Sequence, residues 1–382
     1  MLPTLQPRLA PQGAETVRVM VVDDTPLYRQ LLGELLAGPP GIEVVGTASD
    51  GRMALAQLPQ CLPDLLTLDV EMPVMNGLDT LRHRRQVAPQ VAAIMVSSHT
   101  GQGAATTVQA LEYGAFDCVA KPRQPRAEGV SQLQQRLHRI IQAWRAHQRL
   151  GRMVQGMESP HKPLLAARLA ASTAADRVLP RPQTIVKPSA CEIVVIGVST
   201  GGPQALARVI PQLPAALPVP VVIVQHMPAA FTVALARSLH EKSAIAVVEA
   251  QHRQELEAGT VYIAPGGKQL KLLQPAALSS PCLWLTDDPP ENHCKPSVDY
   301  LFRSVAALYG PRALGIIMTG MGADGVSGLR LMKQAGATVL AQDQASCVVF
   351  GMPMEAIKAG VVDTVVTLEQ LAPALLQHVS HR

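Results

Sequence analysis

The sequence has few aromatic residues, little net charge and no long hydrophobic run. Only 3% of its 382 residues are Phe, Trp or Tyr, and 33 Lys and Arg against 29 Asp and Glu give a formal net charge of +4. Nucleic-acid-binding proteins usually have a concentrated basic patch and aromatic stacking platforms, so we expect no nucleic-acid partner. No apolar run reaches the roughly 18 residues of a membrane-spanning helix, and the N-terminal stretch lacks the apolar core of a signal peptide. We therefore expect a cytoplasmic protein without membrane insertion.

The sequence also lacks clustered cysteines. Its six cysteines are scattered, with no C-x-x-C pair and no interleaved histidines. This pattern argues against a zinc finger or a disulfide scaffold and favours reduced thiols. In contrast, 48% of the residues are hydrophobic, enough to build large aliphatic cores. The length corresponds to two or three domains.

Hydrophobic patterning divides the chain into four parts. Residues 1–16 form a proline-punctuated, flexible N-terminal tail, and residues 17–150 contain five alternations of an aliphatic run with a helical pattern. Residues 151–190 are rich in proline and alanine and are interpreted as a linker, and residues 191–382 form a second α/β region. Continuous apolar runs are typical of parallel strands covered on both faces by helices. We predict two α/β domains, each with a doubly wound parallel sheet.

Polar residues follow four strands of the first predicted sheet. The carboxyl ends of parallel strands meet at one rim, so these residues should converge there. Carboxylates crowded together call for a hard cation such as Mg²⁺, and one of them can then attack a phosphodonor while a lysine offsets the charge. Each residue alone also fits a helix cap or a solvated charge, but their recurrence in order favours the site. The residues are Asp23, Asp24, Asp69, Ser97, Ser98 and Lys121.

The segments VVDDTPLYRQLL, LDVEMPVMNGLD, MVSSHTGQG and AKP make residues 17–150 resemble a response-regulator receiver domain, which implies a flavodoxin-like fold. The resemblance also implies a cis peptide bond between Lys121 and Pro122. Cys118 departs from the family, which usually has an aromatic switch residue there. The implied roles are phosphorylation for Asp69, metal binding with Mg²⁺ for Asp23, Asp24, Asp69 and Glu71, a switch hydroxyl for Ser97, and phosphate pairing for Lys121.

Three residues at strand ends of the second region suggest a hydrolase. Ser199 lies in a G-x-S-x-G turn after an apolar strand, His226 directly follows the next strand, and Asp324 follows the strand LGIIMTG. Each has an ordinary turn or cap interpretation, but a serine nucleophile needs a base and the base needs an orienting carboxylate. The chain order Ser, His, Asp differs from that of α/β-hydrolases, so the turn does not indicate that fold. Backbone N–H groups at Thr200 and Met321 are candidate oxyanion donors.

The motifs IGVSTGGPQAL, VQHMPAAFT, KPSVDYLFRSVA and GIIMTGMGADGVSGL make residues 191–382 resemble the Rossmann-like catalytic domain of chemotaxis protein-glutamate methylesterases. The resemblance implies that Ser199, His226 and Asp324 form the triad. It further implies hydrolysis of glutamyl methyl esters on methyl-accepting chemoreceptors, deamidation of receptor glutamines, and association with chemoreceptor arrays. Ester hydrolysis needs no cofactor. A chemotaxis histidine kinase would phosphorylate Asp69 and so relieve inhibition by the receiver.

One departure and two alternatives stand beside this interpretation. Cys294-Lys295 occupies a position where the family commonly has basic or His-containing pairs. One alternative is a serine hydrolase that acts on a small ester, which activity on p-nitrophenyl esters without activity on receptors would favour. The other is a noncatalytic receptor-binding adaptor, which failure to label Ser199 with an organophosphonate would favour.

Overall fold

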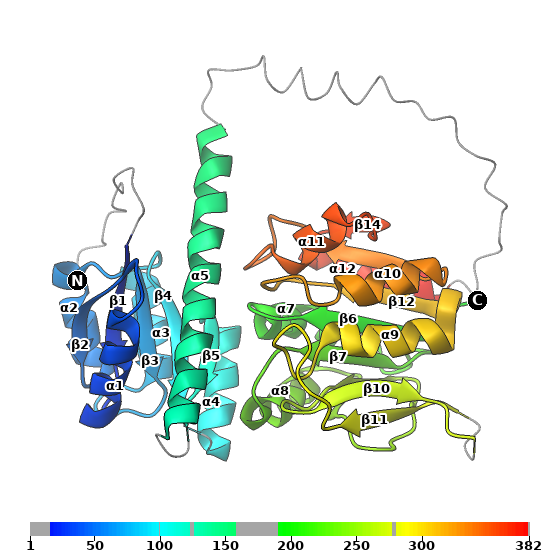
Figure 1. Cartoon of the computed structure of the whole chain (residues 1–382), viewed down its shortest axis with the longest axis horizontal. Helices are drawn as coiled ribbons and strands as arrows, with labels where there is room; N and C mark the ends of the chain where they lie inside the picture. Colours follow the sequence, from blue (N-terminus) through cyan, green and yellow to red (C-terminus); the bar gives the residue numbers. More distant parts are fainter. Residues whose placement is uncertain (1–15, 99, 123–125, 158–189, 277–279, 381–382) are drawn as a thin grey trace.

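The computed structural model describes residues 16–98, 100–122, 126–157, 190–276 and 280–380. The predicted tail, apart from residue 16, lies outside the described residues, as does the predicted linker from 158 to 189. The described residues form two parallel α/β sheets with their helices, as predicted, and Figure 1 shows the N-terminal sheet in blue and cyan and the C-terminal one in green to red.

The first sheet has the strand order β2-β1-β3-β4-β5, and all of its strand pairs are parallel. This is the flavodoxin-like order, so the predicted fold class is confirmed. Alternate residues of β1 enter different cores: Val19 and Val21 pack with α1 and α5, whereas Met20 and Val22 pack with α2, α3 and α4. The strands are β1 Val17–Val22, β2 Ile42–Ala48, β3 Leu65–Asp69, β4 Ala92–Ser97 and β5 Asp117–Ala120.

Short polar side chains begin the central helices of this domain. Asp50, Asn76 and Thr100 each accept a hydrogen bond from the backbone N–H three residues later, which satisfies a donor that the helix leaves free. Helix α5 continues to Met157, so residues 151–157 of the predicted linker are helical. The helices are α1 Pro26–Ala37, α2 Gly51–Cys61, α3 Gly77–Val87, α4 Gly101–Glu112 and α5 Ala127–Met157.

The second sheet has seven parallel strands in the order β14-β13-β12-β6-β7-β9-β8. β7 lies on one side of β6, and the later strand β12 lies on the other, so the strand order reverses at β6. Open α/β sheets bind ligands at the carboxyl end of the strands at such a switch point. The strands are β6 Ile193–Val198, β7 Val221–Gln225, β8 Ala246–Glu249, β9 Thr260–Ile263, β12 Ala313–Ile317, β13 Thr338–Gln342 and β14 Thr364–Val366.

Helices cover both faces of this sheet, with α7, α8 and α12 on one and α9, α10 and α11 on the other. The antiparallel hairpin β10 Gln269–Leu273 and β11 Cys282–Thr286 was not predicted, and it packs against α9. The helices are α7 Gly202–Val209, α8 Ala229–Lys242, α9 Val298–Tyr309, α10 Val326–Gln334, α11 Met352–Lys358 and α12 Leu368–Ser380, with single 3-10 turns η1 Ile210–Gln212 and η2 Gly310–Arg312.

The two domains are packed together through α4 of the first and α7 and α8 of the second (Figure 1). The Glu112 carboxylate at the end of α4 accepts a hydrogen bond of 2.9 Å from the Ser238 hydroxyl of α8 and pairs with the Lys242 ammonium. Val349, in the loop after β13, belongs to the same buried cluster as residues of β1 and α5. The N-terminal domain therefore contacts the strand-end side of the C-terminal sheet.

Candidate active site

Ser199 lies at the turn between β6 and α7, where the backbone passes close to a neighbouring loop. Its N–H donates to the Thr319 carbonyl over 2.9 Å. A Cβ atom on Gly320 would lie 2.6 Å from the Ser199 Cβ, so only glycine allows this approach. The positive φ of this turn falls on Gly201, at 79°, and not on the serine. The turn therefore lacks the strained serine of an α/β-hydrolase elbow, in agreement with the sequence analysis.

Strand register places His226 beside Ser199. Val198 of β6 is paired with Gln225 of β7, so the next residues on these neighbouring strands are Ser199 and His226. The His226 N–H donates to the Val198 carbonyl over 3.1 Å, which continues the ladder by one step. The predicted juxtaposition of these two residues thus follows from the pairing of adjacent parallel strands.

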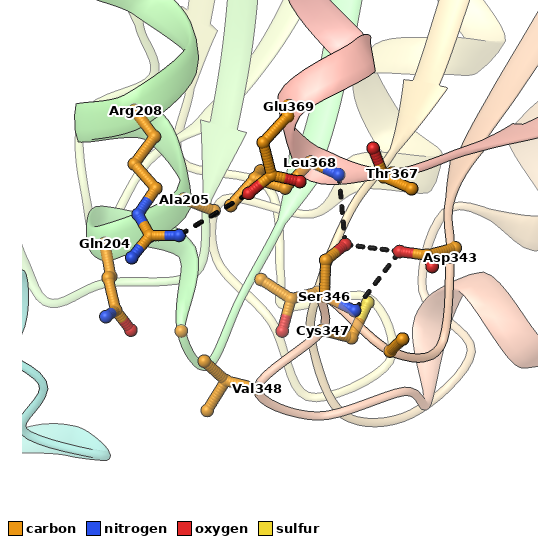
Figure 2. Close-up of a pocket in the computed structure, with 13 residues that line it drawn as sticks. Gln204, Ala205, Arg208, Asp343, Ser346, Cys347, Val348, Thr367, Leu368 and Glu369 are labelled. Carbon is orange, nitrogen blue, oxygen red and sulfur yellow. Dashed lines mark hydrogen bonds and ion pairs between the residues drawn. The ribbon is translucent and has the colours of Figure 1, made fainter.

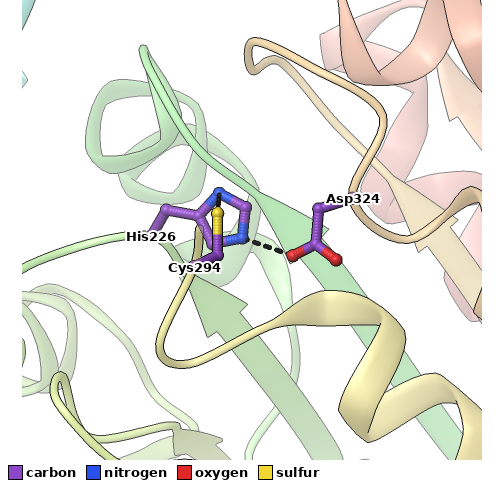
Figure 3. Close-up of side chains that lie close together, drawn as sticks. All are labelled: His226, Cys294 and Asp324. Atoms are coloured by element: carbon purple, nitrogen blue, oxygen red, sulfur yellow. Dashed lines mark hydrogen bonds and ion pairs between the residues drawn. The ribbon is translucent and has the colours of Figure 1, made fainter. Parts of the chain in front are cut away.

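Asp324 reaches the imidazole from the loop after β12. His226 Nε2 and Asp324 Oδ2 are 2.8 Å apart, and Figure 3 shows the carboxylate at one edge of the ring. The Asp324 side chain is buried, and only 12% of the His226 side chain is exposed. The structure therefore forms the predicted contact between the imidazole and the carboxylate.

The N-terminus of α9 holds the Asp324 carboxylate in place. The backbone N–H groups of Val298 and Asp299 donate to it over 2.7 and 3.1 Å, and the Ser297 hydroxyl donates over 2.8 Å. These donors lie at the positive end of the helix, which stabilises an anion. Asn292 Nδ2 adds a bond of 3.0 Å to Asp324 Oδ1. Sequence reasoning missed these residues, although the S-V-D sequence in KPSVDY is a recognisable helix start.

The contact between His226 and Asp324 favours a charged pair. Burial alone would lower the pKa of His226, but its contacts with Asp324 and Cys294 raise this pKa to about 9. Burial alone would raise the pKa of Asp324, but hydrogen bonds from His226, Asn292 and the Val298 N–H lower this pKa to about 2. The proton is therefore held on the imidazole.

The second ring nitrogen of His226 contacts Cys294 and not Ser199. Cys294 Sγ lies 3.7 Å from Nδ1, and Figure 3 shows the thiol next to that nitrogen. Among the described residues, no hydrogen bond joins the Ser199 hydroxyl to His226. The structure thus brings the imidazole and carboxylate into contact, with the serine at the adjacent strand end.

Gln225, the last residue of β7, connects the backbones of the serine and the histidine. Its buried Nε2 donates to the Ser199 carbonyl over 2.9 Å and to the His226 carbonyl over 3.3 Å. A Cβ atom on Gly202 would lie 1.9 Å from Gln225 Oε1, so the second glycine of the S-T-G-G sequence provides room for this amide. The sequence analysis assigned no role to Gln225.

The two candidate oxyanion residues both touch the N-terminal domain. The Thr200 hydroxyl donates a hydrogen bond of 2.5 Å to Asp117 Oδ2 of β5. Met321 packs against the buried cluster that contains residues of β1 and α5. Their predicted role as oxyanion donors stays a prediction.

The predicted acidic cluster of the first domain comes together at the ends of β1 and β3. One carboxylate oxygen each from Asp23, Asp24 and Asp69 lie within 4.8 Å of one another. Lys121 Nζ lies 2.6 Å from Asp69 Oδ2 and 2.7 Å from Asp23 Oδ2. Burial raises the pKa of Asp69 to about 6 despite Lys121, because one ammonium does not fully compensate two buried carboxylates. An all-oxygen cluster that is short of positive charge fits Mg²⁺.

A pocket of about 420 Å³ opens onto this cluster, and its lining includes Glu71 and Ser98. Ser97 is buried, and its hydroxyl donates to the Ser98 carbonyl over 3.2 Å and to the Gly103 carbonyl of α4 over 3.3 Å. Tyr28, which sequence reasoning missed, also lines the pocket and places its ring 4.7 Å from Lys121 Nζ.

Two further expectations concern the end of β5. The expected cis bond between Lys121 and Pro122 is wrong: among the described residues, the cis peptide bond is Lys295-Pro296. Cys118 is fully packed in the core on the α4 side of the sheet, and burial raises the pKa of its thiol to about 12. A small buried thiol therefore stands where receivers usually have an aromatic side chain.

Another pocket, of about 500 Å³, lies between α7, the loop after β13 and the start of α12 (Figure 2). Gly201 and Thr319 border it, and the pair formed by Arg208 and Glu369, 3.7 Å apart, crosses its rim. His226 and Asp324 are not among its lining residues. This pocket adjoins the candidate site without containing its titratable pair.

Comparisons with known proteins cover both domains. The response regulator receiver domain model matches residues 19–130, and the CheB methylesterase model matches residues 194–375. A protein-glutamate methylesterase/protein-glutamine glutaminase of Desulfotalea psychrophila is 43% identical over 96% of this chain and 99% of its own length. A protein of the same name from Geobacillus kaustophilus is 42% identical over 95% of this chain and 99% of its own length.

Among solved structures, the Thermotoga maritima CheB methylesterase catalytic domain is 40% identical, with a TM-score of 0.48, and covers 50% of this chain and 99% of that domain. Within the described part of the chain, no helix combines the length and apolar character needed to span a membrane. The receiver and methylesterase matches lie in the predicted order, and the relatives align over nearly their whole length. The chain therefore belongs to the protein-glutamate methylesterase/protein-glutamine glutaminase family, enzymes in which a response-regulator receiver domain precedes a CheB methylesterase domain.

Proposed function

We propose that this enzyme hydrolyses glutamyl methyl esters on methyl-accepting chemoreceptors, with Ser199, His226 and Asp324 as its catalytic triad. The observation that carries this proposal is the contact of 2.8 Å between His226 and Asp324, formed at the strand end adjacent to that of Ser199. A serine hydroxyl becomes a nucleophile when a neighbouring base takes its proton and a carboxylate orients that base.

In the proposed reaction His226 is the neutral imidazole with its proton on Nε2, and it accepts the Ser199 proton as that hydroxyl attacks the ester carbonyl. Asp324 occupies Nε2, so Nδ1, which contacts Cys294 in this structure, is the ring nitrogen left to accept the proton once the Ser199 side chain turns toward it. The oxyanion is held by backbone N–H groups at Thr200 and Met321. His226 then protonates the departing methoxide, and methanol leaves. Water, deprotonated by the same imidazole, attacks the acyl-enzyme and releases the glutamate and the free serine.

The same machinery supports deamidation of receptor glutamines. A glutamine side chain presents a carbonyl with an amide nitrogen in place of the methoxy oxygen. Ser199 attacks this carbonyl, His226 protonates the leaving nitrogen, and ammonia departs in place of methanol. Hydrolysis of the common acyl-enzyme then gives glutamate in both cases.

We further propose that a chemotaxis histidine kinase phosphorylates Asp69. Asp23, Asp24, Asp69 and Glu71 would hold Mg²⁺, which offsets the charge of the phosphoryl group when bound. Lys121 pairs with the phosphoryl oxygens. The Ser97 hydroxyl, which bonds to Gly103 in this structure, turns toward the new phosphoryl group and releases α4.

The domain contact supports control of the esterase by this phosphorylation. α4 packs on α7 and α8, and Thr200, next to the nucleophile, bonds to Asp117 of the receiver. A closed enzyme of this kind hinders a receptor helix from reaching Ser199. A change in α4 weakens the contact and shifts the enzyme toward an open form that binds receptor arrays.

Methanol release from methylated receptor fragments tests both proposals. Ser199→Ala should lower this rate by about a thousandfold or more, because triad members act as a unit. The variant should still accept phosphate from a small phosphodonor, which serves as the folding control. A near wild-type rate would reject the triad. Asp69→Asn should lose activation by the phosphodonor and keep its basal activity, and equal activation of both proteins would reject the control scheme.

A further inference from the structure

Cys294 is the residue of the candidate site that the proposed reaction does not use. It comes from the loop between β11 and α9, where Cys294 and Glu291 exchange backbone hydrogen bonds of 2.7 and 3.1 Å. Gln269 Nε2 also donates to the Cys294 carbonyl over 3.3 Å. These bonds hold the backbone of Cys294 in place. Its thiol also donates to the Asn292 carbonyl over 3.4 Å, which keeps the sulfur next to His226 Nδ1.

The thiol, the imidazole and a carboxylate form a set of metal-binding groups. One donor atom from each of Cys294, His226 and Asp324 lie within 4.8 Å of one another. Cys294 Sγ and His226 Nδ1 are 3.7 Å apart. Zinc bonds of about 2.3 Å to sulfur and 2.0 Å to nitrogen, at a tetrahedral angle, place two such ligands about 3.5 Å apart. The pair thus needs little movement to hold one ion.

The orientation of the histidine ring also suits a metal ligand. A histidine that binds a metal through one nitrogen usually donates the other N–H to a carboxylate, which fixes the ring. His226 Nε2 already donates to Asp324 in this way, and Ser297 and the N-terminus of α9 hold Asp324. Asp299, a second buried carboxylate, shares the Asn292 amide with Asp324, at 2.9 and 3.0 Å. Two buried carboxylates thus share one neutral amide next to the imidazole.

We propose that Cys294 and His226 bind a borderline-soft divalent cation such as Zn²⁺, with Asp324 orienting the ring, and that this ion inhibits the esterase. Nitrogen and sulfur donors select Zn²⁺ or Cd²⁺ over Mg²⁺, so the site differs in chemistry from the oxygen cluster of the receiver. The bound ion occupies Nδ1, the nitrogen that accepts the Ser199 proton. Inhibition, unlike binding, rests on the proposed function.

Cadmium binding to the full chain tests the site without an activity assay. Thiolate coordination to Cd²⁺ produces a charge-transfer absorbance in the ultraviolet. Cys61 provides a matched control, because Cys61 and Cys294 are the two partly exposed cysteines and the other four are buried. Wild type and Cys61→Ser should show the absorbance at the same Cd²⁺ concentration. Cys294→Ser should need about tenfold more Cd²⁺ or lose the signal, as expected for a lost ligand. Equal titration of Cys294→Ser and wild type would overturn the site.

Inhibition is then measured as methanol release over a Zn²⁺ titration, with EDTA to reverse it and without phosphodonor. Wild type and Cys61→Ser should be inhibited alike, whereas Cys294→Ser should need about tenfold more Zn²⁺. Cys294→Ala and thermal unfolding check that the shift does not come from misfolding. If wild type and the variants bind Cd²⁺ as expected but none of them releases methanol, the proposed function is rejected and the proposed metal site still holds. Activity that Zn²⁺ leaves unchanged in wild type would reject the inhibition.

Discussion

The Thr200 hydroxyl donates a hydrogen bond of 2.5 Å to Asp117 Oδ2, so the residue after the proposed nucleophile Ser199 is joined to the last strand of the receiver. Burial raises the pKa of Asp117, although Arg136, Thr200, the Cys118 N–H and His226 all act to lower it. The closed contact therefore disfavours a negative charge at this position. The proposed phosphorylation of Asp69 would therefore have a direct contact through which to act on the proposed esterase site.

Substitutions of Asp117 should move basal activity in opposite directions. Asp117→Asn keeps an acceptor for Thr200 and removes the disfavoured charge, so it should strengthen closure and lower methanol release without phosphodonor. Asp117→Lys places a cation beside Arg136 and His226 and should open the enzyme, raising basal release about tenfold, equivalent to about 1.4 kcal/mol. Asp79→Asn, on the exposed side of α3, serves as the control. If Asp117→Asn and Asp117→Lys change basal methanol release in the same direction, the contact between Asp117 and Thr200 does not close the enzyme.

Closure should also depend on pH through Asp117. Its pKa is raised in the closed form and takes its ordinary value in the open form, so proton binding favours closure. This stabilisation of the closed form is present at low pH and is lost as the pH rises from about 4 through the raised pKa. Small-angle scattering should show wild type and Asp117→Asn equally compact at low pH, with wild type the more open at neutral pH. Identical profiles of both proteins across that range would rule this out.

The ion pair between Glu112 and Lys242 should contribute modestly to closure. The Lys242 side chain is 43% exposed and the Glu112 side chain 11%, and partly exposed pairs contribute about 0.5–1 kcal/mol. Lys242→Glu places two carboxylates together and should raise basal methanol release about threefold or more. The double variant with Glu112→Lys should restore wild-type release. A double variant that stays as active as the single one would show that the pair has no part in closure.

Asp324 and Asp299 should differ sharply in their effect on catalysis, although both are buried beside Asn292. Asp324→Asn keeps the size of the side chain but no longer fixes the imidazole tautomer, so kcat should fall by about a thousandfold or more. Asp299 bonds to Asn292 and to the Gly328 N–H and not to His226. Asp299→Asn should therefore keep kcat within about tenfold of wild type. Similar losses in both variants would point to a structural effect on α9, which thermal unfolding would reveal.

Much of the fold and the candidate site followed from the sequence. Continuous apolar runs predicted the five strands of the first sheet, and strand-end residues predicted the acidic cluster because parallel strands expose their carboxyl ends at one rim. The same rule placed Ser199 next to His226, since their strands are neighbours in the sheet. The hairpin β10 and β11 escaped prediction: Lys271 interrupts the apolar residues of β10, and the alternation of strands with helices that indicates a parallel sheet does not reveal an antiparallel hairpin.

The sequence alone determined which chemical groups this protein has and in what order its strand ends present them, because those depend on local periodicity and residue type. Only the tertiary structure decided which groups touch. It set Cys294 against His226, Asp324 against the start of α9, and Asp117 against Thr200. These contacts join residues at least 25 positions apart, the smallest separation being that of Asp299 and Asp324. They depend on how loops and domains pack, which short-range patterns do not encode.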